Sequence, residues 1–178
     1  MKPTQEFIDQ ILILRCQLRD RQAFAELIDH YQRPVRYFIA RLVGNPDLAD
    51  ELAQETWLAV LSKIHTLRDA GTFTVWLYRI ARNKVYQELR RRKVTIELDE
   101  GFAAPDDTVD EIGTFEDAAK LHRCLEKLKP LQKEVLLLRF LEEMSYEQMA
   151  DVLGCNIGTV RSRIFHAKLA LKKELEVS

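Results

Sequence analysis

The strongest chemical signal in this sequence is a cluster of cations near its end. Residues 155–173 read CNIGTVRSRIFHAKLALKK and contain no acidic side chain from Asn156 to Lys173, although the 178-residue chain carries a formal net charge of only −1. Arginine and lysine side chains in such a run can neutralise phosphate groups, which supply a large share of the affinity of proteins for nucleic acid. We therefore predict that this segment binds nucleic acid.

The spacing of apolar residues in this segment predicts a helix with two unlike faces. Four residues recur at steps of four, three and four and should pack inward: Val160, Ile164, Ala167 and Leu171. The opposite face and its flanks suit the major groove of DNA, because a small residue permits close approach while polar and basic side chains reach base edges and phosphates. The residues assigned to this surface are Asn156, Gly158, Thr159, Arg161, Ser162, Arg163, Phe165, His166 and Lys168.

The residues before this helix predict a helix-turn-helix unit. Ser145 and Gln148 have the form of a capping box, in which a hydroxyl group caps the helix and a glutamine follows three residues later. Gly154 then breaks the helix, and Asn156 can cap the next one. Two short helices joined by a glycine-containing turn are typical of this DNA-binding unit. Two alternatives stay open: Phe165 could pack on a neighbouring helix, and the basic flanks could be only a solvated face.

A second cationic stretch, residues 72–93, has aromatic residues between its cations. It reads TFTVWLYRIARNKVYQELRRRK. This mixture suits unstacked bases, because bases stack on aromatic rings while cations hold the phosphate backbone. The alternative is that Trp76, Leu77 and Ile80 are simply core residues, and for these three the core interpretation is favoured.

A third candidate site is an acidic stripe on the helix predicted for residues 45–64. Asn45 at the cap and Pro46 at the first helical position mark the start of this helix. Most of its circumference is apolar, so its polar residues form one narrow stripe. The stripe consists of Asp50, Glu51, Gln54 and Glu55. It could bind a basic partner, and the alternative is a stripe that is only solvated.

Helical patterns account for almost the whole chain outside one acidic segment. Apolar residues recur at three- and four-residue steps, and no alternating strand pattern persists. Residues 94–117 contain many acids and no lysine or arginine, as a linker would. We predict an all-α protein with two small helical domains, residues 1–93 and 118–178, joined by a flexible acidic linker at 94–117. A loop inside one domain is the alternative, although so long a loop is uncommon.

Other classes of function find little support in the sequence. Cys16, Cys124 and Cys155 are odd in number and widely scattered, which argues against a disulfide framework, and no metal-ligand spacing is present. No nucleophile–base pair, carboxylate dyad or phosphate-binding glycine loop indicates an enzyme. No apolar run approaches the length of a membrane span, so a cytoplasmic location is the default expectation.

Four motifs together resemble the sigma-70 family of bacterial RNA polymerase sigma factors, specifically the short extracytoplasmic-function (ECF) type. DELAQETW resembles the polymerase-binding helix, and FTVWLYRIARN followed by LRRRK resembles the helix that melts the promoter and reads its −10 element. MSYEQMADVLG and GTVRSRI resemble the helix-turn-helix that reads the −35 element. The resemblance covers about residues 8–173 in the family's order. It implies a promoter-specificity subunit, without a cofactor, that selects the start site and promotes DNA opening.

The resemblance also implies partners and residue roles. The acidic stripe docks on the clamp helices of the largest polymerase subunit, and the flap of the second subunit is a further contact. The loop His65–Phe73 holds a flipped −10 base, Asn83 helps to read it, and an anti-sigma factor holds the protein inactive. The residues assigned to single-stranded −10 DNA are His65, Thr66, Arg68, Thr72, Phe73, Arg79, Arg82, Asn83 and Arg90.

Two positions depart from the family's pattern. Gln87 lies where many relatives have aspartate, and His166 lies where arginine is frequent. A neutral imidazole lacks the two-pronged donor that suits guanine, so a promoter sequence cannot be borrowed from relatives. Two rival functions remain: a stand-alone helix-turn-helix regulator, which would need a stronger phosphate-binding surface of its own, and an adaptor that contacts only proteins.

Overall fold

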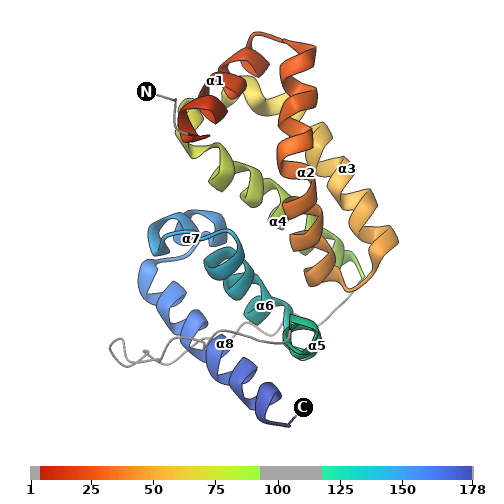
Figure 1. Ribbon diagram of the computed structural model, residues 1–178, viewed down its shortest axis with the longest axis vertical. Helices are drawn as coiled ribbons and strands as arrows, with labels where there is room; N and C mark the ends of the chain where they lie inside the picture. The colour runs from red at the N-terminus through yellow and green to blue at the C-terminus, as the bar shows by residue number, and fades with distance from the viewer. Residues whose placement is uncertain (1–4, 93–117, 178) are drawn as a thin grey trace. The chain divides into compact units, whose positions relative to one another are not determined.

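The computed structural model describes residues 5–92 and 118–177, and all regular elements in these two ranges are helical (Figure 1). The chain divides into two compact units, one up to Glu88 and the other from Leu89 onwards. The predicted all-α, two-domain class is therefore confirmed. The predicted linker at 94–117 lies outside the described residues, and the domain boundaries at 93 and 118 stay predictions.

The first unit contains four α-helices and two short 3-10 turns. They are α1 (Gln5–Gln17), α2 (Arg21–Val43), α3 (Pro46–Lys63), η1 (Ile64–Thr66), η2 (Ala70–Thr72) and α4 (Phe73–Arg91), whose last three residues lie beyond the division at Glu88. The second unit contains α5 (Ala118–Lys127), α6 (Pro130–Leu136), a π-helical turn η3 (Leu137–Leu141), α7 (Tyr146–Leu153) and α8 (Ile157–Val177).

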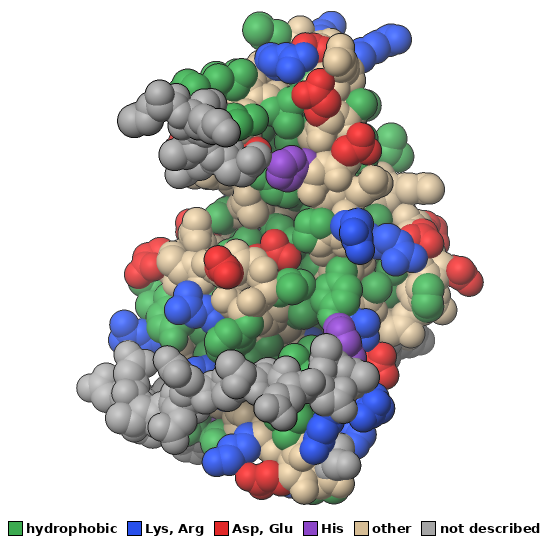
Figure 2. Space-filling view, viewed as in Figure 1, with side chains coloured by type: hydrophobic (Ala, Val, Ile, Leu, Met, Phe, Trp, Pro, Cys, Tyr) green, Lys and Arg blue, Asp and Glu red, His purple; other side chains and the backbone are tan. Residues whose placement is uncertain are grey.

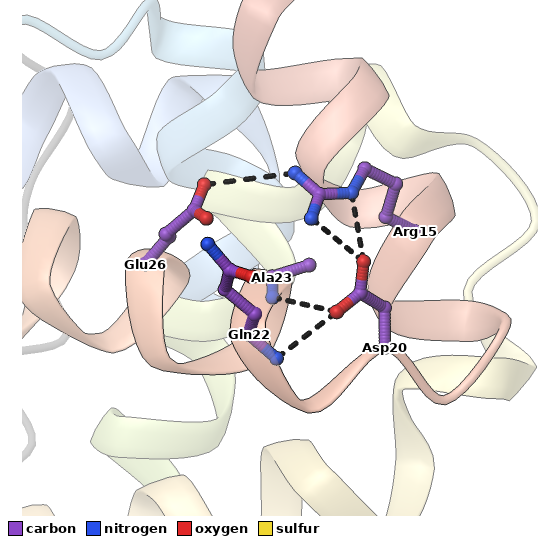
Figure 3. Close-up of polar contacts among 5 residues, drawn as sticks. All are labelled: Arg15, Asp20, Gln22, Ala23 and Glu26. Atoms are coloured by element: carbon purple, nitrogen blue, oxygen red, sulfur yellow. Dashed lines mark hydrogen bonds and ion pairs between the residues drawn. The ribbon is translucent and has the colours of Figure 1, made fainter.

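The connection between α1 and α2 is held by polar contacts around Asp20 (Figure 3). Its carboxylate accepts hydrogen bonds from the backbone N–H groups of Gln22 and Ala23 at 3.0 and 3.1 Å, which caps the start of α2. Arg15 at the end of α1 donates to the same carboxylate at 2.9 Å and lies 3.7 Å from Glu26. These bonds hold the pKa of Asp20 below its ordinary value, the Ala23 N–H being the largest cause and Arg15 the next.

The core of the first unit joins α2, α3 and α4 through aromatic and aliphatic side chains. Phe38 of α2 meets Tyr78 of α4 edge to face, with ring centroids 5.2 Å apart, and both rings are buried. Trp57 of α3 meets Phe24 of α2 in the same manner at 6.3 Å. At the start of α3, the Asn45 side chain accepts the Leu48 N–H at 3.0 Å, as the sequence predicts. The core therefore fixes the three helices that carry the candidate sites of this unit.

The helix-turn-helix of the second unit is formed by α7 and α8. Ser145 accepts the Gln148 N–H at 3.2 Å and donates its own N–H to the Gln148 side chain at 2.9 Å, so the predicted capping box is confirmed. Gly154 ends α7 with φ +64°, a left-handed conformation that favours glycine. The four predicted inward residues of α8 are all buried: Val160, Ile164, Ala167 and Leu171.

Among the described residues, no helix combines the length and apolar character that a membrane span requires. The same part of the chain holds no group of three or more histidine, cysteine, aspartate or glutamate residues placed to bind a metal ion. The three cysteines are free, with Cys16 and Cys124 buried and Cys155 half-buried.

Candidate functional site

The start of α8 presents a small, open surface. Asn156 caps the helix, because its side-chain oxygen accepts both the N–H and the hydroxyl of Thr159, at 2.8 and 3.0 Å. Gly158 is exposed, and a Cβ added there would meet only the Asn156 oxygen, at 3.3 Å. The backbone of the first turn is therefore open to close approach, as the sequence predicts.

Arg161 is exposed on α8 and lies over an aromatic ring of the preceding helix. Its guanidinium carbon is 5.9 Å from the centroid of the Tyr146 ring, and that of Arg139 is 5.2 Å from the same centroid. Arg139 is itself fixed, because it donates to the Met144 carbonyl at 2.8 Å. Tyr146 thus restrains Arg161 through a cation–π contact while leaving it exposed.

Phe165 and His166 lie together on the next turn of α8. Their rings meet edge to face with centroids 5.4 Å apart, and both side chains are half-buried. One turn along, the Lys168 ammonium group lies 5.4 Å from the ring centroid of Phe140. Phe165 is thus only partly exposed, whereas the sequence predicts that it points outward.

Two predicted residues of the α8 surface are corrected by the structure. Ser162 is only 5% exposed, so it does not present an open hydroxyl to a base. Arg163 is half-buried, and its Nε and Nη1 atoms are buried without hydrogen bonds. It is therefore less exposed than predicted, and its contact with DNA stays a prediction.

The loop between α3 and α4 is compact and largely polar. Asp69 accepts the Gly71 N–H at 2.9 Å, and its carbonyl accepts the Thr72 hydroxyl at 2.8 Å. Thr66 donates to the Lys63 carbonyl at 2.7 Å. The exposed residues of this loop include four predicted ones: His65, Thr66, Arg68 and Thr72.

Phe73 does not belong to this exposed set, although the sequence analysis assigned it to the same DNA-binding surface. Its side chain is 1% exposed, and its ring meets that of Tyr31 edge to face at 5.3 Å. A phenyl ring at the first position of α4 is stabilised by packing against α2, so it belongs to the core of the unit. A contact between Phe73 and −10 DNA stays a prediction.

Polar residues on α4 continue from this loop along one helix face. Arg79, Asn83 and Arg90 are exposed and follow one another at steps of four and seven residues. Arg82 is half-buried, with its guanidinium carbon 4.5 Å from the Tyr86 centroid. The core interpretation holds for Leu77, which is fully buried, whereas Trp76 and Ile80 are half-buried.

The acidic stripe of α3 lies at the surface, but two of its residues form ion pairs within the unit. Asp50 pairs with Arg36 of α2, whose Nη2 atom is 3.2 Å from Oδ2, and this hydrogen bonding lowers the pKa of the Asp50 carboxyl group. Glu55 pairs with Lys84 of α4 at 3.0 Å. Glu51 and Gln54 are exposed.

Exposed leucines extend this stripe in a way the sequence analysis missed. Leu58 is 66% exposed and Leu61 is 54% exposed. They lie four and seven residues after Gln54, on the same helix face. Their spacing was visible in the sequence, but an apolar helix does not show which of its apolar residues are buried.

Apolar side chains reach the surface elsewhere too, as Figure 2 shows, and Phe140 and Leu141 of the second unit are among the exposed ones.

Comparison with known proteins defines the class of these two helical units. Residues 27–95 match the family described as Sigma-70 region 2, and residues 118–171 match the family described as Sigma-70, region 4. The first range contains the α3 stripe, the loop and α4. The second contains the helix-turn-helix. The class is that of the RNA polymerase sigma factors, with both regions in the predicted order.

Curated relatives match along nearly the full chain. The RNA polymerase sigma-H factor of Pseudomonas aeruginosa is 35% identical, with 94% of each chain covered. The ECF RNA polymerase sigma-E factor of Haemophilus influenzae is 31% identical, with 97% of each chain covered. The chain belongs to the sigma-70 family and to its ECF group. It is a sigma factor for promoter-specific initiation of transcription by RNA polymerase.

Solved structures agree with this assignment. CnrH, in complex with the cytosolic domain of CnrY, is similar with a TM-score of 0.68 and 26% identity, covering 96% of this chain and 98% of CnrH. The sigma factor RpoE of Bartonella quintana, in complex with the anti-sigma factor NepR, is similar with a TM-score of 0.67 and 27% identity. The match covers 87% of this chain and 98% of RpoE.

Proposed function

We propose that the exposed face of α3 binds core RNA polymerase at the clamp helices of its largest subunit. The surface begins with the acidic stripe, Asp50, Glu51, Gln54 and Glu55, and continues into Leu58 and Leu61. An acidic region next to exposed apolar side chains suits a protein partner, because charge steers the encounter and apolar burial stabilises the complex.

The loop between α3 and α4, with the polar face of α4, captures single-stranded −10 DNA. The support is the juxtaposition along the chain of an ordered polar loop and the helix face that carries Arg79, Asn83 and Arg90. Cations hold the strand through phosphates, and the loop accepts a base once it has left the stack. Arg82, which is half-buried on the same helix, adds to the positive charge that attracts these phosphates.

The exposed part of α8 reads the −35 element as duplex. Gly158 and Thr159 allow close approach, Arg161 and Lys168 reach the DNA, and Phe165 and His166 meet base edges. Asn156 acts through the helix cap rather than through a base contact. Because His166 replaces a frequent arginine, we expect a base preference at this position that differs from that of arginine-bearing relatives.

The remaining proposals concern boundaries, partners and location. Residues 1–93 and 118–178 act as the two domains and 94–117 as the linker between them. The protein works in the cytoplasm as a non-enzymatic subunit, since the polymerase supplies the chemistry. An anti-sigma factor is a further partner, as for the Bartonella relative, and the flap of the second polymerase subunit contacts the second domain, where Phe140 and Leu141 offer exposed apolar side chains.

The observation that carries this proposal is the order of three surfaces along one nearly neutral chain: the acidic and apolar face of α3, the polar loop with the basic face of α4, and the helix-turn-helix. The test compares binding of one promoter duplex, selected from a random library with reconstituted holoenzyme, by the free chain and by holoenzyme. We expect weak binding by the chain alone and tight binding by holoenzyme. Equal, sequence-specific affinity in both cases would instead support the stand-alone regulator.

A further inference from the structure

One side chain of α1 contacts the loop that follows α3, although about fifty residues separate them in the sequence. The Nε2 atom of Gln17 donates hydrogen bonds to the backbone carbonyls of Ile64, at 3.0 Å, and Leu67, at 2.7 Å. The Gln17 side chain is half-buried. A primary amide has two N–H bonds, so a single group can serve both acceptors at once.

Both carbonyls accept a hydrogen bond from outside the loop, and the Ile64 carbonyl also accepts the Leu67 N–H. Ile64 follows α3 and opens the turn η1, and Leu67 ends this turn. The last carbonyls of a helix lack partners within the helix, so they bond to turns, side chains or water. Gln17 meets the beginning and the end of the η1 turn together, which fixes the direction in which the chain leaves α3.

A second glutamine of α1 approaches the other end of the loop. A Cβ added to Gly71 would lie 3.3 Å from the Nε2 atom of Gln10, so the Gln10 amide lies close to this glycine. Gln10 and Gln17 are seven residues apart and therefore share one face of α1. Both short turns, η1 and η2, pack against this helix, and Figure 1 shows them beside it.

The two ends of the loop differ in how they are held. Its second half is ordered from within, because Asp69 accepts the Gly71 N–H at 2.9 Å and its carbonyl accepts the Thr72 hydroxyl at 2.8 Å. In the first half, Leu67 donates its N–H to the Ile64 carbonyl at 3.2 Å, and Ile64 donates its own N–H to the Val60 carbonyl of α3. The Gln17 amide adds a bond from α1 to each of these two carbonyls, Ile64 and Leu67. Between these anchors lie the exposed side chains of His65 and Arg68.

We propose that Gln17 is a positioning residue for recognition of the −10 element. It touches no DNA; it holds the first half of the loop in its base-accepting shape before DNA arrives. A loop ordered in advance loses less conformational entropy when it captures a base, and so discriminates better. The proposal rests on the function proposed above for this loop.

The test uses two variants of Gln17 in reconstituted holoenzyme. Gln17→Met keeps the length of the side chain and removes its donors, and Gln17→Glu keeps a polar group that cannot donate at neutral pH. Gln32→Met, at an exposed position of α2, is the matched control. The probe is a single-stranded oligonucleotide with the non-template −10 sequence of a promoter selected with this holoenzyme, together with versions abasic at one position each.

The measured quantity is the affinity for the intact oligonucleotide divided by the affinity for an abasic one. The abasic position used is the one at which loss of the base weakens binding by wild-type holoenzyme most, and this loss is called the abasic penalty. We expect both Gln17 variants to lower this ratio on the order of tenfold, the effect of losing two hydrogen bonds. Affinity for core polymerase and for −35 duplex should match that of Gln32→Met. A merely structural role would lower stability and all binding together and leave the ratio unchanged.

The outcomes separate this inference from the function on which it rests. If wild-type holoenzyme shows no abasic penalty at any position, the base-capturing loop itself is wrong, and the role of Gln17 with it. If the wild type shows a penalty and both folded Gln17 variants keep it, the loop function stands and the positioning role is overturned. If Gln17→Met does not fold, the decision comes from Gln17→Glu, whose polar side chain suits a half-buried site.

Discussion

Lys84 of α4 and Glu55 of α3 form an ion pair, with the ammonium nitrogen 3.0 Å from the carboxylate. Asp50 of the same acidic stripe pairs with Arg36 of α2. Both pairs are partly exposed, so each contributes little to stability, but each lowers the net negative charge available to a basic partner. Glu51 and Gln54 should therefore account for more of the polymerase affinity than Asp50 and Glu55.

The first prediction concerns charge reversal on this surface. Glu51→Lys or Gln54→Lys should weaken binding to core polymerase by about tenfold or more, because each places a cation against a basic partner. Asp50→Asn should weaken it less. Fluorescence anisotropy with labelled sigma factor and core enzyme measures the affinities.

Asp29→Lys is the matched control for Glu51→Lys, since it makes the same charge reversal at an exposed site on α2. It should bind core polymerase like the wild type. Wild-type affinity in both the Glu51→Lys and Gln54→Lys variants would contradict the proposed polymerase surface.

The second prediction concerns the ring under Arg161. Tyr146→Leu removes the aromatic face that restrains Arg161 and Arg139, and should weaken holoenzyme binding to a −35 duplex by about two- to fivefold, as expected for an exposed cation–π contact. Tyr146→Phe keeps the ring and should bind nearly as the wild type does. An equal loss in both variants would point to the hydroxyl group instead of the ring.

The third prediction is a pH dependence that arises from the Asp20 cap. Hydrogen bonds from the Ala23 N–H and from Arg15 keep the folded-state pKa of Asp20 below its unfolded value. The carboxylate therefore stabilises the fold above the ordinary pKa of about 3.9, and this contribution is lost as the pH falls through the lower, folded value. Thermal melts between about pH 6 and pH 3 should show a smaller decrease for Asp20→Asn than for the wild type. Parallel decreases would contradict this role.

The fourth prediction concerns thiol reactivity. Burial is the largest cause that raises the pKa of Cys16, to about 11, and the reactive thiolate is correspondingly scarce near pH 8. Cys155 is half-buried in the turn before α8. Iodoacetamide should modify Cys155 well before Cys16, as followed by mass spectrometry of peptides. Faster modification of Cys16 in the folded protein would show that α1 opens readily from the core.

Local signals in the sequence were sufficient for several helix caps and for the inward face of α8. The capping box of Ser145 and Gln148, the cap at Asn45 and the inward face of α8 all depend on residues three or four positions apart. Such interactions form within one or two turns of the same helix, so residue type and spacing predict them. The order of motifs along the chain also predicts the sigma-70 family.

The same reasoning was wrong for particular side chains of the candidate sites. Phe73 follows the polar loop directly in sequence, yet its ring packs on Tyr31, some forty residues earlier. Ser162 lies opposite the packed face on a helical projection but is covered. A projection assigns a direction to each side chain and contains no information about which neighbours fill the space around it.

The sequence by itself determined the helices, their caps and the family of the protein, because each depends on short-range spacing or on the order of motifs. Only the tertiary structure showed that Gln17 bonds to Ile64 and Leu67, and that Arg36 and Lys84 pair with half of the acidic stripe. These contacts join segments distant in the chain. They arise only when packing of the core brings those segments together, and no local pattern of residues records that approach.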